Sequence, residues 1–146
     1  MGTEKNKQFR RIEAIQNKTV KIINFANRLD SPSLSYKTLR VLKLQDHVRL
    51  YNFLFAHDHM NNRLPPALND SLVLVANTHM YYTRASHLNN VFLPRVRTST
   101  FGLKSILFQS GTEWNIFVKK FNHVDFTQIS RSLSKQKLIE FFLDLY

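Results

Sequence analysis

The chain contains no cysteine, and its 146 residues include only three glycines, four prolines and one tryptophan. The absence of cysteine excludes disulfides, thiolate zinc sites and cysteine nucleophiles. Glycine and proline mark most turns, so their scarcity favours helices over many short strands. No apolar run reaches the roughly 18 residues that a transmembrane helix needs. The charged stretch from Met1 to Arg11 lacks the apolar core of a signal peptide, so we expect an intracellular protein of the nucleus or cytoplasm, not a secreted one.

Acidic residues are also few: ten face 21 lysines and arginines, which gives a net charge of +11. No acid occurs between Asp70 and Glu113, although this run holds four cations. Such a balance favours a polyanionic partner, and we expect the backbone of RNA or DNA in preference to a membrane. The alternative is a solvated basic surface that only keeps the protein in solution.

Catalytic signatures are missing as well. The sequence has no glycine-rich phosphate loop, no His-Glu-x-x-His motif and no Asp-Asp pair, and its acids are scattered. His57 and His59 point about 200° apart on a helix, so they cannot share a metal ion. We therefore predict no catalytic residues, no metal site and no cofactor, and we expect a protein that is not an enzyme.

The residues that are present predict a mainly α fold. A hydrophobic share of 43% with twelve phenylalanines can form a real core. We expect one small helical domain over residues 1–146, with four or five helices and one short β-hairpin near 91–108. Residues 1–30 form a basic amphipathic helix that can be semi-independent, and residues 31–146 form the helical body. The periodicity predicts helices over Phe9–Leu29, Tyr36–Leu42, Leu44–Met60, Trp114–Phe121 and Lys135–Tyr146.

The stretch from Arg95 to Phe117 contains most of the features on which the predicted fold depends. Val91–Val96 and Leu103–Phe108 are expected to pair as the two strands of the hairpin. Thr112 is expected to cap a helix that begins near Trp114. Trp114 offers a large apolar body with one N–H donor, which predicts burial with its edge partnered. The residues that we expect to shape the core are Gly102, Gly111, Trp114 and Phe142.

Several short motifs occur in an order that resembles a known family. They are Leu64-Pro65-Pro66-Ala67-Leu68, Tyr82-Thr83-Arg84, Arg97-Thr98, Gly102, Ser105-Ile106, Gly111, Trp114-Asn115 and the closing Leu138 to Tyr146. Together, over about Gln16 to Tyr146, they resemble the C-terminal region of non-LTR (LINE-type) retrotransposon reverse transcriptases, downstream of the polymerase palm and thumb. Family members usually carry Leu-Pro after Trp-Asn, whereas Ile116-Phe117 follows here. Because the family's catalytic aspartate pair is absent, the resemblance implies a fragment without the palm and without the endonuclease.

The resemblance and the charge together predict a non-catalytic segment that binds nucleic acid. Its lysines and arginines would meet phosphates, which fixes position without reading sequence. Tyr81, Tyr82 and Arg84 together resemble a site at which a base stacks beside a cation, and the alternative is that the two tyrosines pack this loop onto the core. The candidate binding residues are Arg10, Arg11, Lys18, Lys21, Tyr82, Arg84, Arg95, Arg97 and Lys104. The alternative is a structural or interaction module that packs on the rest of a reverse transcriptase polyprotein, with incidental basic charge.

Overall fold

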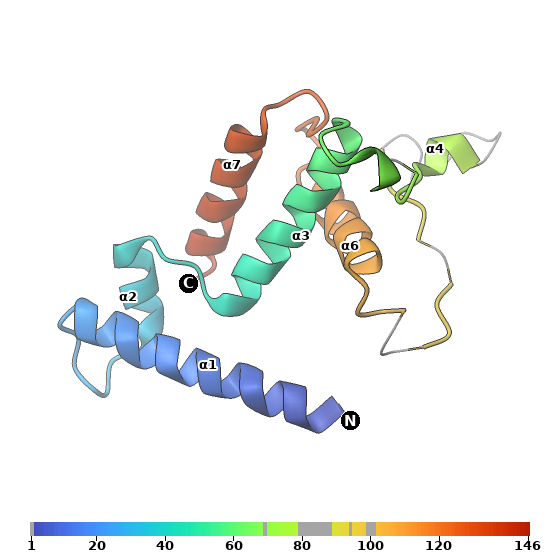
Figure 1. The fold of residues 1–146 in the computed structure, drawn as a ribbon. Coiled ribbons are helices and arrows are strands. Elements are labelled where there is room, and N and C mark those ends of the chain that lie inside the picture. Colours follow the sequence, from blue (N-terminus) through green and yellow to red (C-terminus); the bar gives the residue numbers. More distant parts are fainter. Residues whose placement is uncertain (1, 69, 79–88, 94, 99–101) are drawn as a thin grey trace. The chain divides into compact units, whose positions relative to one another are not determined.

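A computed structural model describes residues 2–68, 70–78, 89–93, 95–98 and 102–146, with the side chains of residues 2–6 left out. These residues form the α-helices α1 (Gly2–Ile23), α2 (Pro32–Leu39), α3 (Leu44–Met60), α4 (Val75–Thr78), α6 (Ile106–Lys120) and α7 (Arg131–Asp144), and a 3₁₀ turn, η1 (Pro66–Leu68). The mainly helical fold class is therefore confirmed (Figure 1). Within these ranges, no helix has the length and apolarity needed to cross a membrane.

The chain divides into two compact units. Unit 1 comprises Met1–Val48 and Gln136–Tyr146, and unit 2 comprises Arg49–Lys135. Unit 1 thus holds α1, α2, the first turn of α3 and most of α7. Unit 2 holds the rest of α3 together with η1, α4 and α6.

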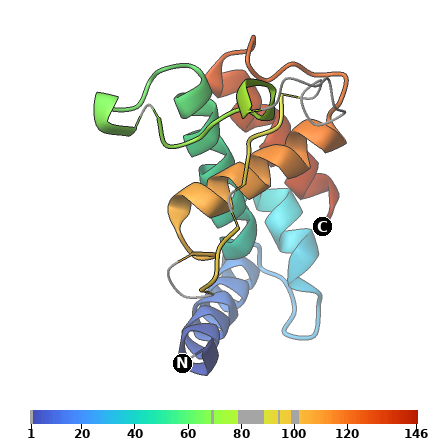
Figure 2. The same ribbon diagram turned by 90° about the vertical axis from the view of Figure 1, so that its right-hand side faces the viewer.

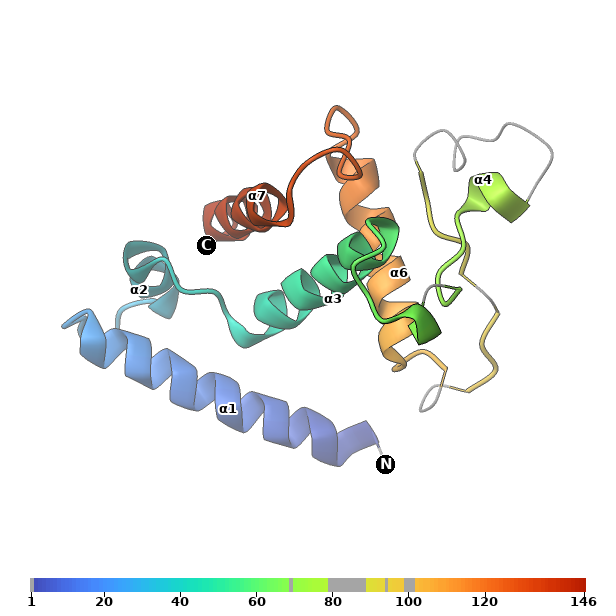
Figure 3. The same cartoon turned by 45° about the horizontal axis from the view of Figure 1, so that its top comes forward.

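In unit 1, α1 packs against α2 through polar side chains. The Tyr36 hydroxyl donates to Asn17 Oδ1 at 2.8 Å, and Asn24 Nδ2 donates to Ser35 Oγ at 3.3 Å. Val20 is buried in the same face of α1. Figures 1 and 3 both show α2 against the C-terminal half of α1. Ile12, Ile15, Ile22 and Ile23 of α1, by contrast, are each at least half exposed.

Both ends of unit 1 are tied to the segment that follows α2. Gln16 of α1 donates to Leu42 O at 2.9 Å and accepts from Leu44 N at 3.0 Å. The hydroxyl of Tyr146 accepts from Lys43 N at 2.9 Å and donates to Asp46 Oδ2 at 2.7 Å. The backbone groups of residues 42–44 that form these bonds have no partner within a helix. The bonds therefore hold this segment to both α1 and the last residue of the chain.

In unit 2, α6 crosses the part of α3 that belongs to this unit (Figure 2). The crossing is filled by aromatic rings. Phe53 of α3 stacks on Trp114 of α6 with ring centroids 5.3 Å apart, and it meets Phe117 and Phe126 edge to face. All four rings are at most 1% exposed. Stacked and edge-to-face pairs are the geometries that aromatic side chains favour, so this cluster is the core of the unit.

The predicted start of the helix around Trp114 is wrong. α6 begins at Ile106, eight residues earlier, and its N-cap is Ser105, whose Oγ accepts from Phe108 N at 3.3 Å. Thr112 does not cap a helix end, because its hydroxyl donates to Phe108 O within the helix. Gly111 lies inside α6, and a Cβ at this position would come within 2.8 Å of Leu93 Cδ2. The glycine therefore permits close packing of residues 91–93 against the helix and does not mark a turn.

The predicted hairpin is not found among the described residues. Ile106–Phe108, assigned to its second strand, are helical in α6. Val91, assigned to its first strand, instead forms an isolated antiparallel bridge with Leu74. Asn115 of α6 reinforces this position, because its side chain accepts from Val91 N at 2.7 Å and donates to Val91 O at 2.9 Å. Position 94 and positions 99–101 lie outside the described residues.

Candidate nucleic-acid interface

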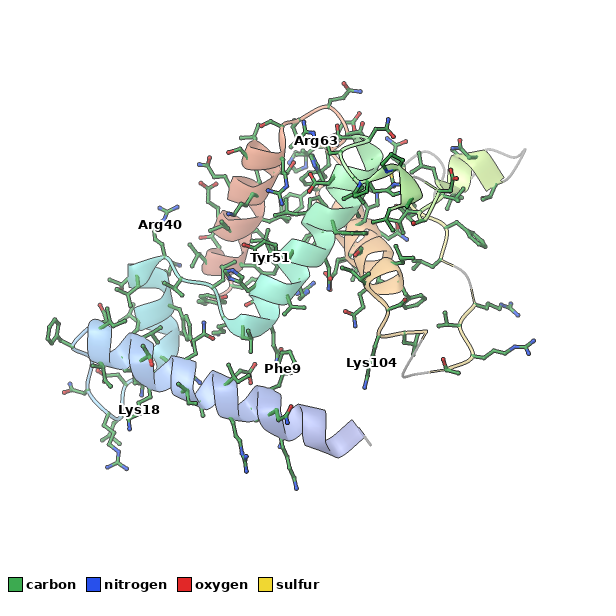
Figure 4. All side chains as sticks on the ribbon, viewed as in Figure 1. Phe9, Lys18, Arg40, Tyr51, Arg63 and Lys104 are labelled. Atoms are coloured by element: carbon green, nitrogen blue, oxygen red, sulfur yellow. The ribbon has the colours of Figure 1, made fainter. Side chains whose placement is uncertain are left out.

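The basic face of α1 is the first candidate surface. Arg10, Arg11 and Lys18 are exposed, whereas Lys21 is half-buried. Residues 11 apart on a helix differ by about 20° around its axis, so Arg10 and Lys21 lie almost in one line. Figure 4 shows Lys18 leaving α1 on the side opposite to Phe9. The helix therefore gathers the four predicted cations on a solvent-facing side.

The end of α1 adds a cation that sequence reasoning missed. The helix stops at Ile23, six residues before the predicted end, and the chain turns back through residues 24–31. In this turn the carbonyl oxygen of Arg28 accepts a hydrogen bond from Lys21 Nζ at 2.9 Å. Lys18, Lys21 and Arg28 then line one groove of about 830 Å³. A helix continued to Leu29 would have hidden this arrangement, so only the position of the helix end could have indicated it.

The second candidate surface precedes α6 in unit 2. Arg95 and Arg97 are exposed on an irregular segment, and Lys104 is exposed in the turn just before Ser105. Hydrogen bonds hold the segment at both sides, from Phe92 N to Val73 O at 2.7 Å and from Gly102 N to Thr98 O at 3.1 Å. Lys104 projects outward ahead of α6 (Figure 4). The remaining two candidates, Tyr82 and Arg84, lie outside the described residues.

The ion pairs in the described ranges do not include the lysines and arginines of the two candidate surfaces. Arg49 Nε meets both carboxylate oxygens of Glu113 at 3.1 Å, and Arg131 Nε meets Asp58 Oδ2 at 2.8 Å. His57 Nδ1 lies 3.9 Å from Asp58 Oδ1, a contact that becomes an ion pair only when the imidazole is protonated. Within the described chain, no ion pair includes Arg10, Arg11, Lys18, Lys21, Arg95, Arg97 or Lys104. Their charge is thus not neutralised by the acids that the structure describes.

The predicted core residues are placed in both units. Trp114 and Phe142 have no exposed surface. The indole Nε1 of Trp114 donates to Asn89 O at 2.9 Å, so its edge is partnered as expected. Gly111 is buried and Gly102 is half-buried. At Gly102 a Cβ would approach Val96 Cβ to 2.6 Å, so any larger residue would displace the segment that carries Arg95 and Arg97.

Two histidines, His57 and His59, are buried in unit 2. His57 Nε2 lies 3.2 Å from Ile129 O, and His59 Nε2 accepts from Leu72 N at 3.2 Å. Burial lowers the pKa of His57, while the Ile129 carbonyl and the Asp58 carboxylate raise it and Arg63 and Arg131 lower it further. Among the residues that the structure describes, no three His, Cys, Asp or Glu side chains are grouped as a metal site would require.

Comparison with known proteins gives no match: no family model, no curated protein and no solved structure matches this chain.

Proposed function

We propose that this protein is a non-catalytic nucleic-acid-binding segment that holds RNA or DNA by its phosphate backbone. The observation that supports this most strongly is the state of its cations. Arg10, Arg11, Lys18, Arg95 and Lys104 are exposed, and the ion pairs of the described residues do not include them. With an excess of eleven positive charges over the whole chain, such side chains attract a polyanion without reading its sequence.

The order of the sequence motifs supports the family part of the proposal. According to this proposal, the segment is the C-terminal region of a non-LTR retrotransposon reverse transcriptase, and a separate polymerase domain catalyses DNA synthesis. Its partners are then RNA or DNA and the remainder of that polyprotein, and its location is the nucleus or cytoplasm. The segment itself uses no cofactor and carries no catalytic residue in this proposal.

Binding should be independent of base sequence. We expect the purified chain to bind two unrelated duplexes at low salt with Kd values that agree within about threefold, because phosphate contacts carry no base information. Replacing Arg95 and Arg97 by alanine should weaken both complexes equally. Lys37→Ala with Arg40→Ala is the matched control, since it removes the same charge from a hollow that also contains Glu140 and Asp144. A strong preference for one duplex would contradict backbone binding.

One observation favours a second candidate, an interaction module. Ile12, Ile15, Ile22 and Ile23 of α1 are each at least half exposed. Contiguous exposed apolar residues often mark a protein contact. In this alternative the isoleucine face packs on the rest of a longer polypeptide, and the basic charge is incidental. Absence of binding to both duplexes at low salt would favour it over nucleic-acid binding.

A further inference from the structure

The turn after α1 holds a phenylalanine in a conformation that suits glycine. Phe25 has φ 50°, in the left-handed region. Its N–H donates to Ile22 O at 3.2 Å, and the next N–H, of Ala26, donates to Lys21 O at 3.0 Å. This pair of bonds is the Schellman pattern of a helix end, in which the left-handed position is usually glycine because a Cβ is unfavourable there.

Packing does not explain this choice, because Phe25 is 97% exposed. A large aromatic ring therefore stands in solvent at a position where its own backbone is strained. Strained backbone at such a position is a common feature of functional sites. Phe25 immediately precedes Ala26, which lines the groove described above.

The groove itself has the composition of a site for a phosphorylated ligand. Its charged lining consists of Lys18, Lys21 and Arg28, and its apolar lining of Ile22, Ala26 and Pro32. The single acid of residues 24–31, Asp30, does not line it and accepts from Asn27 N at 2.9 Å. The Lys21 ammonium is held by Arg28 O, which positions one charge in advance. A volume of about 830 Å³ is within the usual range for ligand sites.

We propose that the α1–α2 loop and the second half of α1 form a site for single-stranded nucleic acid, in which Phe25 stacks on an unpaired base while Lys18 and Arg28 contact the neighbouring phosphates. Exposed aromatic rings beside a cationic groove are the usual elements of single-strand binding, because every base has a face on which to stack. In a duplex the base faces are occupied by their neighbours, so Phe25 has no surface to use. This inference rests on the proposed function and names the form of nucleic acid that this site prefers.

The first test uses Phe25→Gly in the full chain. Glycine suits the left-handed turn, so this variant should unfold at the same or a higher urea concentration than the native protein. We expect its affinity for a labelled oligothymidylate, measured by fluorescence anisotropy, to fall about 5- to 150-fold, as for loss of one stacked base. Affinity for a duplex of the same length should change by less than about twofold. Leu29→Ala, equally exposed in the same loop, is the control and should leave both affinities unchanged.

The second test concerns the phosphates. Lys18→Gln with Arg28→Gln should flatten the slope of log affinity against log salt on the oligothymidylate by about 1.4, which corresponds to two phosphate contacts on a single strand. Lys37→Gln with Arg40→Gln removes the same charge outside the groove and should flatten it by less than half as much.

The outcomes separate this inference from the function on which it rests. If the native chain binds both forms of nucleic acid but Phe25→Gly binds the oligothymidylate equally well, the single-strand site is wrong and backbone binding stands. If the native chain binds neither form at low salt, both are wrong. Binding to anionic phospholipid vesicles, without binding to the oligothymidylate, would assign the groove to a lipid headgroup and would overturn this inference.

Discussion

Trp114 contacts three separate segments of unit 2 through its aromatic ring and its indole N–H group. Its ring stacks on Phe53 and meets Phe126 edge to face, while its N–H donates to Asn89 O. Burial of so large an apolar surface is a major stabilising contribution, and the hydrogen bond removes the cost of burying the donor. The residue therefore stabilises the unit in which the exposed Arg95 and Arg97 lie.

Truncation of this ring should have a large effect on stability. We expect Trp114→Ala to lower the free energy of unfolding by about 3–5 kcal/mol, because it leaves a cavity among aromatic rings. Trp114→Phe keeps most of the packing and deletes the bond to Asn89, so its cost should be smaller. Ile116→Ala, on an exposed position of the same helix, is the control. Urea denaturation measures all three, and an equal, small loss for Trp114→Ala and Ile116→Ala would contradict this account.

His57 should make stability depend on pH. Burial lowers its pKa below the ordinary value of 6.5. The unfolded chain then takes up a proton near pH 6.5 while the folded chain takes it up only at lower pH, so below pH 6.5 the unfolded state binds more protons. The contribution of His57 to the free energy of unfolding should therefore be constant above this pH and should decrease as the pH falls through the window below it.

Urea denaturation at a series of pH values between about 7.5 and 5 tests this prediction. His57→Gln is the informative variant, because its amide can still donate to Ile129 O but does not titrate. The decrease in stability should be smaller in this variant than in the native chain. An identical pH dependence in both proteins would show that other groups are responsible.

At the scale of elements, α6 shows which structural features the sequence could predict. Its apolar spacing after Trp114 correctly predicted a helix, and Phe117 and Val118 are buried in it. Its beginning was missed because Leu103–Phe108 is predicted as a strand and Thr112 as the N-cap, whereas the helix begins at Ile106 and continues through Gly111. The sequence does not show whether a glycine forms a turn or lies inside a helix where a Cβ would clash. At Gly111 the deciding contact is with Leu93, 18 residues earlier in the chain. Such a contact depends on the tertiary structure.

The residues of the candidate groove at the end of α1 could also be predicted only in part from the sequence. Lys18 and Lys21 could be found from charge and helical spacing, because both lie on one regular element. Arg28 could not be found, because its place beside them depends on a helix that ends at a left-handed phenylalanine. The basic run before α6 could be found in the sequence as a stretch without acids. The bridge between Val91 and Leu74 could not be predicted in the same way.

The N-cap of α6 provides a test at this scale. Ser105→Ala removes the acceptor for Phe108 N and the donor to Gly102 O at 2.8 Å. We expect a loss of about 1 kcal/mol in the free energy of unfolding, typical of a lost N-cap. Ser105→Asp keeps the acceptor and places negative charge at the positive end of the helix dipole, so it should retain most of the stability. Chemical denaturation would contradict the assignment if both variants were equal to the native chain.

At the scale of the whole molecule, the excess of positive charge is the property that the proposed function explains. The acid-free run from Ser71 to Thr112 contributes Arg84, Arg95, Arg97 and Lys104, and α1 with its following turn contributes a second group. The two groups lie in different units, so each can be tested by its own variants. Counterion release links the number of phosphate contacts to the salt dependence of binding.

The salt dependence of binding to duplex DNA is therefore the most direct test of nucleic-acid binding by charge. If the four cations of the acid-free run each meet one phosphate, they should contribute about −3 to −4 to the slope of log affinity against log salt. Replacing Arg95 and Arg97 by alanine should bring this slope closer to zero by about 1.8. A filter-binding titration at several salt concentrations gives both values. Absence of binding at low salt, or the same slope in the double variant and the native chain, would contradict the account.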